Sequence, residues 1–348
     1  MIKYQKFIII ISLISIFFLK DNNKVMYFFS NNFGDNLNYF LLNDMTNKNL
    51  EYYDVTINRQ QNQFDFYLVK KLDELSKINL LFIGSILDII SNWTYIFNND
   101  DNKYKTIISK LFYKIYDFFN PLIIFGTGFI SYQKYESESY FRNINVIAVR
   151  GNETLHRLKR NGIKIKKDVI LADPAILAPM LLNISEINNM NFNKKYNLCI
   201  IPHFIDANNP FIKTKIFINN SIILNINENP YKLINDISKC KNVLSSGLHG
   251  LIISDSLGIP NMRMIVSDLI IGGDYKFIDY YSSYGLELPF KIDLRNTTFS
   301  EKELNSLSSN YLITREKIRE KQCQLLSKFP LKLNSKYDYF KKYVCSYN

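Results

Sequence analysis

The sequence has 348 residues, of which 47% are hydrophobic, and a formal net charge of +11. The apolar fraction is too high for a disordered chain, and the 12 glycines exclude a collagen-like or low-complexity architecture. The 4 widely spaced cysteines exclude a disulfide framework and a C-x-x-C zinc site, and the 3 histidines leave little room for a histidine-rich metal centre. The positive charge suits an anionic partner, but no stretch is typical of a nucleic-acid module.

An uncharged apolar run, residues 7–19, lies near the N-terminus between Lys6 and Lys20. A helix of this length spans roughly 20 Å, less than the ~30 Å hydrocarbon core of a bilayer. No small-x-small cleavage site follows it. We therefore predict that residues 1–23 form a single uncleaved membrane anchor and that the protein is membrane-associated. A signal-like segment and a buried first element of the fold are the alternatives.

Short apolar runs with strand character alternate with helical patterns along the chain. The predicted strands lie at residues 25–29, 79–83, 122–125, 145–149, 198–201, 222–225, 242–244 and 262–266. The predicted helices lie at residues 35–43, 103–118, 153–160, 231–239 and 248–257, and at 300–327 and 335–347 in the charged C-terminal region. This alternation is typical of parallel sheets covered by helices on both faces, so we predict an α/β fold.

The polar, asparagine-rich segment 181–195 divides the chain into two similar halves, and we predict that it is an inter-domain linker. It separates an N-terminal domain, residues 24–180, from a C-terminal domain, residues 196–299. By analogy with other two-lobed α/β enzymes, residues 300–348 are expected to form helices that pack back across the lobes.

Polar residues follow several of the predicted strands. Asp35, after Gly34, is placed to cap the helix that follows the first strand. Arg150 ends a strand where open sheets bind ligands, and its planar guanidinium suits a carboxylate or a phosphate. Asp173 precedes Pro174, which holds its backbone extended at another strand end. We predict that Asp35, Arg150 and Asp173 bind substrate. The alternative is a structural turn for Asp35 and a surface ion pair with a nearby carboxylate for Arg150.

The segment Ser-Ser-Gly-Leu-His-Gly, residues 245–250, lies between a strand and a helix. His249 is therefore expected in the first helical turn, where free backbone N–H groups and the helix dipole favour a bound phosphate. The dipole lowers the pKa of an imidazole there, and a bound anion raises it again. His249 is our candidate acid/base catalyst, although a lone histidine can also be structural. The neighbouring candidate substrate-binding residues are Ser245, Ser246, Leu248 and Gly250.

Two other basic residues follow the same logic in the second half of the chain. His203 comes directly after a predicted strand, where it can bind substrate or cap a loop. Lys276 lies where a loop enters a helix rich in aromatic residues, where it can contact a sugar or a phosphate. The alternative for Lys276 is the polar face of an amphipathic helix.

In this order, the motifs resemble the polysaccharide pyruvyl transferase family. The resemblance covers about residues 25–285 and rests on Asn32-Phe33-Gly34-Asp35, Gly126-Thr127-Gly128, Val149-Arg150-Gly151 with Thr154 and Leu158, Asp173-Pro174-Ala175, Ile201-Pro202-His203, Cys240-Lys241, Ser245-Ser246-x-Leu248-His249-Gly250, Gly258-Ile259-Pro260, and Lys276-Phe277 with Asp279-Tyr280. It implies two Rossmann-like domains that face a cleft, as in B-type glycosyltransferases.

The resemblance also implies a reaction, the transfer of a pyruvyl group from phosphoenolpyruvate to a sugar, as a ketal, with no metal or further cofactor. His249 matches the family's catalytic histidine, which would protonate the enolpyruvyl methylene, and Leu248 with His249 would contact the donor phosphate. Asp35 or Asp173 would orient the acceptor, a glycan or lipid-linked sugar. Many members carry arginine directly before this Leu-His pair, where the chain has Gly247.

The glycine at position 247 leaves open which residues bind the donor phosphate, and the function itself has two alternatives. Phosphate affinity would have to come from Arg263, Lys276 or Arg150, or activity would be weakened. One alternative function is a nucleotide-sugar glycosyltransferase on the same fold. Another is a catalytically degenerate, membrane-tethered carbohydrate-binding protein.

Overall fold

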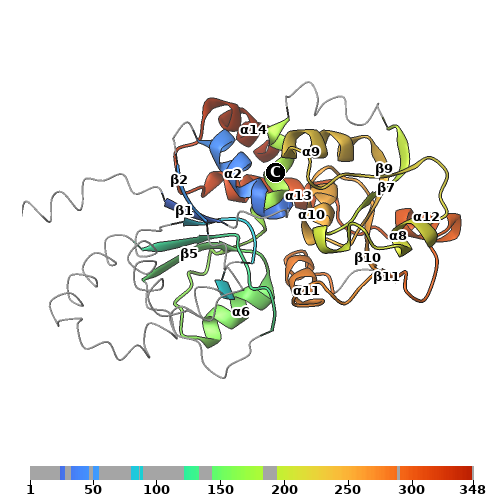
Figure 1. Cartoon of the computed structure of the whole chain (residues 1–348). Helices are drawn as coiled ribbons and strands as arrows, with labels where there is room; N and C mark the ends of the chain where they lie inside the picture. Colours follow the sequence, from blue (N-terminus) through green and yellow to red (C-terminus); the bar gives the residue numbers. More distant parts are fainter. Residues whose placement is uncertain are drawn as a thin grey trace, which may run out of the picture.

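The computed structural model describes residues 24–27, 33–46, 50–54, 80–85, 87–88, 121–132, 143–182, 194–287 and 291–346 (Figure 1). Three predictions fall outside these residues, namely the anchor at 1–23, the helix at 103–118 and most of the linker at 181–195. None of the described helices is both long enough and apolar enough to cross a membrane.

The N-terminal half forms a parallel sheet in the order β2-β1-β3-β4-β5-β6. Its strands are β1 (Lys24–Tyr27), β2 (Glu51–Asp54), β3 (Leu80–Leu81), β4 (Leu122–Phe125), β5 (Ile144–Val149) and β6 (Ile170–Leu171). The inner strands are rich in leucine, isoleucine and valine, because a sheet covered on both faces needs apolar side chains in both directions. After β1 comes α2 (Phe33–Met45), and after β5 comes α6 (Asn152–Arg160).

The C-terminal half forms a second parallel sheet, in the order β11-β10-β9-β7-β8. Its strands are β7 (Tyr196–Ile201), β8 (Ser221–Ile223), β9 (Cys240–Ser245), β10 (Asn261–Ile265) and β11 (Lys291–Asp293). Its helical segments are η2 (Phe204–Asp206), α8 (Phe211–Thr214), α9 (Pro230–Ser238), α10 (Leu248–Ser256) and α11 (Tyr275–Ser282).

The strand order of the second sheet reverses between β7 and β9. The chain runs from β7 outward to β8, returns to β9, and then continues to β10 and β11 on the other side. In open parallel sheets, a ligand crevice forms at such a reversal, outside the carboxyl ends of the two strands. The topology therefore directs attention to the residues that follow β7 and β9.

The predicted α/β fold with parallel sheets is confirmed. The predicted strand at 122–125 coincides with β4, but β2 and β11 were missed because they are short, polar edge strands. The prediction of one helix at 300–327 was wrong. That segment forms α12 (Glu301–Ser309) and α13 (Arg315–Ser327), because Ser300 with Glu303 caps the first helix and Thr314 caps the second.

One apolar core extends through both halves of the described chain. Its buried side chains include Leu41 of α2, Ile234 of α9 and Leu251 of α10. Between the sheets runs η1 (Pro174–Leu181), which is buried along its whole length and packs against both α2 and α10. The halves are therefore joined by hydrophobic packing as well as by the chain itself.

The last two helices, α13 and α14 (Ser335–Cys345), return to the N-terminal half. In Figure 1, α14 (red) lies beside α2 (blue). Lys336 Nζ and Tyr337 OH of α14 each donate to Asp44 of α2 at 2.8 Å. Gln322 of α13 donates to the carbonyl oxygen of Ile176 in η1 at 2.7 Å.

The structure corrects the expectation that the spaced cysteines form no disulfides. Cys199 of β7 is bonded to Cys240 at the start of β9, and their Cα atoms are 5.8 Å apart. Cys323 of α13 is bonded to Cys345 of α14, with a Cα–Cα distance of 5.1 Å. Spacings of 41 and 22 residues gave no sign of these pairs, because sheet and helix packing bring the cysteines together.

Candidate active site

Two histidines follow the two strands that flank the reversal in the second sheet. His203 comes just after the end of β7, and His249 comes just after the turn that ends β9. Ser245 Oγ donates to the carbonyl oxygen of Ile201 at 2.8 Å, and Ser246 Oγ accepts from the backbone N–H of His203 at 2.8 Å. The two serines thus tie the strand ends together, while their predicted contact with substrate stays a prediction.

The turn into α10 is packed more tightly at Gly250 than at Gly247. Leu248 and Gly250 are buried in the first turn of α10, where Gly250 packs against Ser245. Gly247 precedes the helix in extended backbone, with φ −95° and ψ 142°. A Cβ added to Gly247 would meet its nearest neighbour, Cδ2 of His203, at 3.6 Å, which is an ordinary van der Waals contact. The backbone at position 247 therefore has room for a Cβ atom.

The imidazole of His249 lies between the first turns of α10 and α2. A Cβ added to Gly34 of α2 would lie 1.7 Å from His249 Nδ1, so only glycine allows this approach. His249 Nε2 is buried and has no hydrogen-bond partner among the described residues. Because two helix N-termini favour negative charge here, the site can hold an anion that accepts a hydrogen bond from a protonated His249.

The electrostatics of the site keep both imidazoles neutral at pH 7. Burial is the largest cause that lowers the pKa of His249, to about 3, and positive charge lowers it further. This charge comes from Lys276, Arg150 and His203. Burial and then Lys276 lower the pKa of His203 to about 4, while Asp206 acts in the opposite direction. A bound anion would counter the positive charge and raise both pKa values.

Lys276 lies in the first turn of α11, half-buried beside the ring of Phe277. Its charge acts on both His203 and His249, which places it near both imidazoles. The structure therefore brings together three of the predicted site residues, which come from the ends of two strands and from one helix start.

Proton uptake on anion binding follows from these pKa values. Sulfate stays fully ionised near neutral pH. We expect each sulfate to bind with uptake of less than one proton at pH 7, and this number to rise toward about one proton as the pH falls to 5. The bound anion raises the imidazole pKa values, so at any pH between the free and bound values the complex holds more protons. Calorimetry in buffers of different ionisation enthalpy measures the uptake. Equal uptake by the double variant His203→Asn/His249→Asn would contradict this origin.

The two candidate arginines are engaged with carboxylates of the protein. Arg263, on β10, pairs with Asp274 through Nη1 at 2.5 Å and stacks on Phe277 at 3.8 Å. Arg150 is buried and pairs with Asp279 through Nε at 2.9 Å. The structure thus places both guanidinium groups in ion pairs, and their predicted contact with substrate stays a prediction.

Asp173 lies at the end of β6 and combines a capping oxygen with an unpartnered one. Oδ1 accepts from the backbone N–H of Ala175 at 2.9 Å, whereas Oδ2 is buried without a partner among the described residues. Burial raises the pKa of Asp173 to about 6, against the opposing effects of the Ala175 N–H and of Arg150. A carboxyl group with this pKa can hold or release a proton near neutral pH. Asp35 lies in the first turn of α2, and the roles of both aspartates stay predictions.

Sequence reasoning missed the role of Asp279, which it used only as part of a motif. Asp279 is fully buried and contacts Arg150 and Thr154 across the two halves of the chain. The available signal was its spacing of three residues after Lys276, because residues three apart share one face of a helix.

Comparison with known proteins agrees with the motifs. The sequence model of the family described as "Polysaccharide pyruvyl transferase" matches residues 8–268. The chain is also similar to "Uncharacterized protein L143" of Acanthamoeba polyphaga mimivirus, with 30% identity over 168 residues. That match covers 47% of this chain and 55% of the viral protein, so the chain spans about half of its relative's length. The family match includes His203 and His249 and ends before α11.

Proposed function

Because the chain belongs to the polysaccharide pyruvyl transferase family, we propose that it transfers a pyruvyl group from phosphoenolpyruvate to two hydroxyls of a sugar. The family implies a transferase with a glycan acceptor. The donor, the acid/base role of His249 and the two Rossmann-like lobes facing a cleft are the finer parts of the proposal.

The observation that carries the proposal is the buried, unpartnered Nε2 of His249 between two helix N-termini. We place the donor phosphate there, within reach of Lys276 and His203. The positive charge that lowers the pKa of His249 in the free protein is then balanced by the phosphate. The donor thereby makes His249 a proton donor, and protonation begins only when the site is filled.

The reaction balances with the groups at hand. A proton from His249 adds to the methylene carbon of phosphoenolpyruvate and leaves positive charge on the carbon that bears the phosphate. One sugar hydroxyl attacks that carbon and loses its proton, the C–O bond to phosphate breaks, and the second hydroxyl closes the ketal. The two hydroxyl protons replace the one His249 gave and protonate the released phosphate. Asp173, whose pKa is about 6, is our candidate to accept a hydroxyl proton.

We also propose that the apolar run at residues 7–19, which lies outside the described residues, anchors the protein beside a lipid-linked acceptor. This part of the proposal rests on the sequence alone.

The function is tested with the full chain, phosphoenolpyruvate and a panel of glycans. The expected result is phosphate release that depends on the acceptor, together with an equal amount of acid-labile pyruvate on the glycan. Parallel reactions receive nucleotide sugars as donors. Sugar transfer from a nucleotide sugar, without turnover of phosphoenolpyruvate, would replace the proposal with a glycosyltransferase. Binding of glycans without turnover of either donor would indicate a carbohydrate-binding protein.

A further inference from the structure

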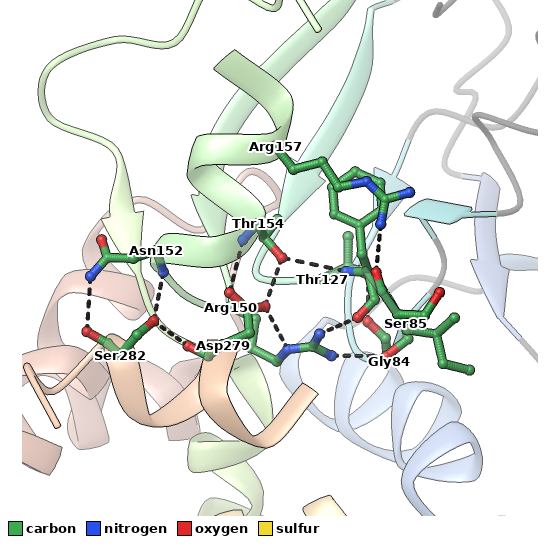
Figure 2. Close-up of polar contacts among 12 residues, drawn as sticks. Gly84, Ser85, Thr127, Arg150, Asn152, Thr154, Arg157, Asp279 and Ser282 are labelled. Carbon is green, nitrogen blue, oxygen red and sulfur yellow. Dashed lines mark hydrogen bonds and ion pairs between the residues drawn. The ribbon is translucent and has the colours of Figure 1, made fainter. Parts of the chain in front are cut away.

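Asp279 joins the two halves of the chain through a buried ion pair (Figure 2). Its carboxylate, on α11, accepts from Arg150 Nε at 2.9 Å, from the backbone N–H of Thr154 at 2.9 Å and from Thr154 Oγ at 2.6 Å. Asp279 is 0% exposed and Arg150 is 1% exposed. Arg150 directly follows β5 and Thr154 lies in the first turn of α6, so the carboxylate fixes a helix of one half against the other half.

Further contacts set the orientation of α11 in this joint. The backbone N–H of Asn152 donates to Ser282 Oγ at 2.8 Å, and Asn152 Nδ2 donates to the carbonyl oxygen of Ser282 at 3.0 Å (Figure 2). A Cβ added to Gly151 would lie 1.6 Å from the carbonyl oxygen of Asp279, so the turn and the helix are in close contact. Contacts at Asp279 and at Ser282, nearly one turn apart, restrict both sliding and rotation of α11.

The same guanidinium also binds the loops that follow two strands of the first sheet. Arg150 Nη1 donates to Ser85 Oγ at 2.9 Å, after β3, and Nη2 donates to the carbonyl oxygen of Phe129, after β4. Arg150 therefore holds α11 against the carboxyl edge of the N-terminal sheet, which is the edge where ligands bind in folds of this kind.

Lys276 lies three residues before Asp279, on the same face of α11 and nearly one turn closer to the start of the helix. Its charge acts on both His203 and His249, so a small movement of α11 would change the cationic site. We propose that Asp279 is a positioning residue, which holds α11 through Arg150 and Thr154 so that the charge of Lys276 stays close enough to act on His203 and His249. This inference rests on the proposed function.

A purely structural joint between the two halves would not require a buried ion pair such as Arg150–Asp279. A buried ion pair loses the hydration of two charges, and well-packed apolar residues often stabilise a fold equally well. An ion pair fixes direction and distance more narrowly than apolar packing does, because each hydrogen bond has a preferred length and angle. This geometry suits a contact that sets the place of a charged side chain.

The test compares Asp279→Asn with Lys276→Met by NMR of the histidine rings in the full chain. Since Lys276 lowers the pKa of His203, we expect both variants to raise that pKa, and Asp279→Asn to have no further effect when Lys276→Met is present. The exposed His156 serves as the internal reference. For catalysis, Asp279→Asn is expected to lower kcat/KM for phosphoenolpyruvate by about 100-fold.

The matched control is Asp88→Asn, which breaks the partly buried Arg157–Asp88 pair, at 2.8 Å, within the N-terminal half. It is expected to lower thermal stability and leave the pKa of His203 unchanged.

If Asp279→Asn does not fold, Thr154→Val is the second variant. It removes one of the three donors, keeps the ion pair and is expected to give a smaller shift of the His203 pKa in the same direction. An unchanged pKa of His203 in a folded variant, or a shift that persists with Lys276→Met, would overturn the proposal. Both outcomes are measured as the pKa of His203 and do not depend on turnover, so the test holds even if phosphoenolpyruvate is not the donor.

Discussion

Replacement of His249 by asparagine is expected to lower kcat for pyruvyl transfer by about 10²–10⁴-fold, the usual contribution of a positioned acid or base. Asparagine keeps a hydrogen-bond donor of similar size in the first turn of α10, so the fold and the anion site are preserved. It cannot supply the proton that the methylene carbon requires. The measurement is the acceptor-dependent release of phosphate at saturating phosphoenolpyruvate.

The control for His249 is His156→Asn, because His156 is an exposed residue in the middle of α6. That variant should keep the wild-type rate. A His249→Asn enzyme that turns over as fast as the wild type would remove His249 from the chemistry and leave it a role in binding at most.

Replacement of Lys276 by methionine is expected to raise the KM for phosphoenolpyruvate by about 10–100-fold, because a hydrogen bond to a charged group contributes roughly 1.5–3 kcal/mol. A much smaller effect on kcat is expected, since the proposed role of the lysine is to bind the donor phosphate and not to transfer a proton. Titration of the donor under steady-state conditions measures both constants. Lys241→Met, at the exposed amino end of β9, is the matched control and should leave both unchanged.

Gly247→Arg tests the same role of positive charge in donor binding, by adding a guanidinium group instead of removing an ammonium group. The backbone at position 247 is extended, and a Cβ there would make only ordinary van der Waals contacts. We expect the added guanidinium to lower the KM for phosphoenolpyruvate about 10-fold and to recover much of the loss caused by Lys276→Met. A folded Gly247→Arg protein that binds the donor no more tightly would show that the phosphate lies elsewhere.

Local patterns in the sequence were sufficient to predict the secondary structure around His249. The strand, Ser-Ser-Gly turn and helix around His249 are specified by neighbours in the chain, and the structure has them as expected. The approach of Gly34 to His249 was not predictable, although Gly34 was part of a motif, because it depends on how α2 and α10 pack.

Contacts between residues that are far apart in the chain could not be predicted from the sequence. Arg150 and Asp279 are separated by 129 residues, and no spacing rule connects them, so their ion pair could not be predicted, while the expected contact of Arg150 with substrate stays a prediction. The disulfides were missed for the same reason. The break between α12 and α13 was readable in principle, since Thr314 is a favourable cap and residues 304–314 carry no charged side chain.

The return of α13 and α14 to the first sheet has a consequence for the order of events during synthesis. The ring of Phe329 lies 6.1 Å from that of Phe82 and 5.6 Å from that of Phe125, and Tyr337 is fully buried. The N-terminal half therefore lacks part of its core until these late residues leave the ribosome. Its apolar surface stays exposed while the second half is translated, which makes it a target for chaperones and couples its folding to the completion of the chain.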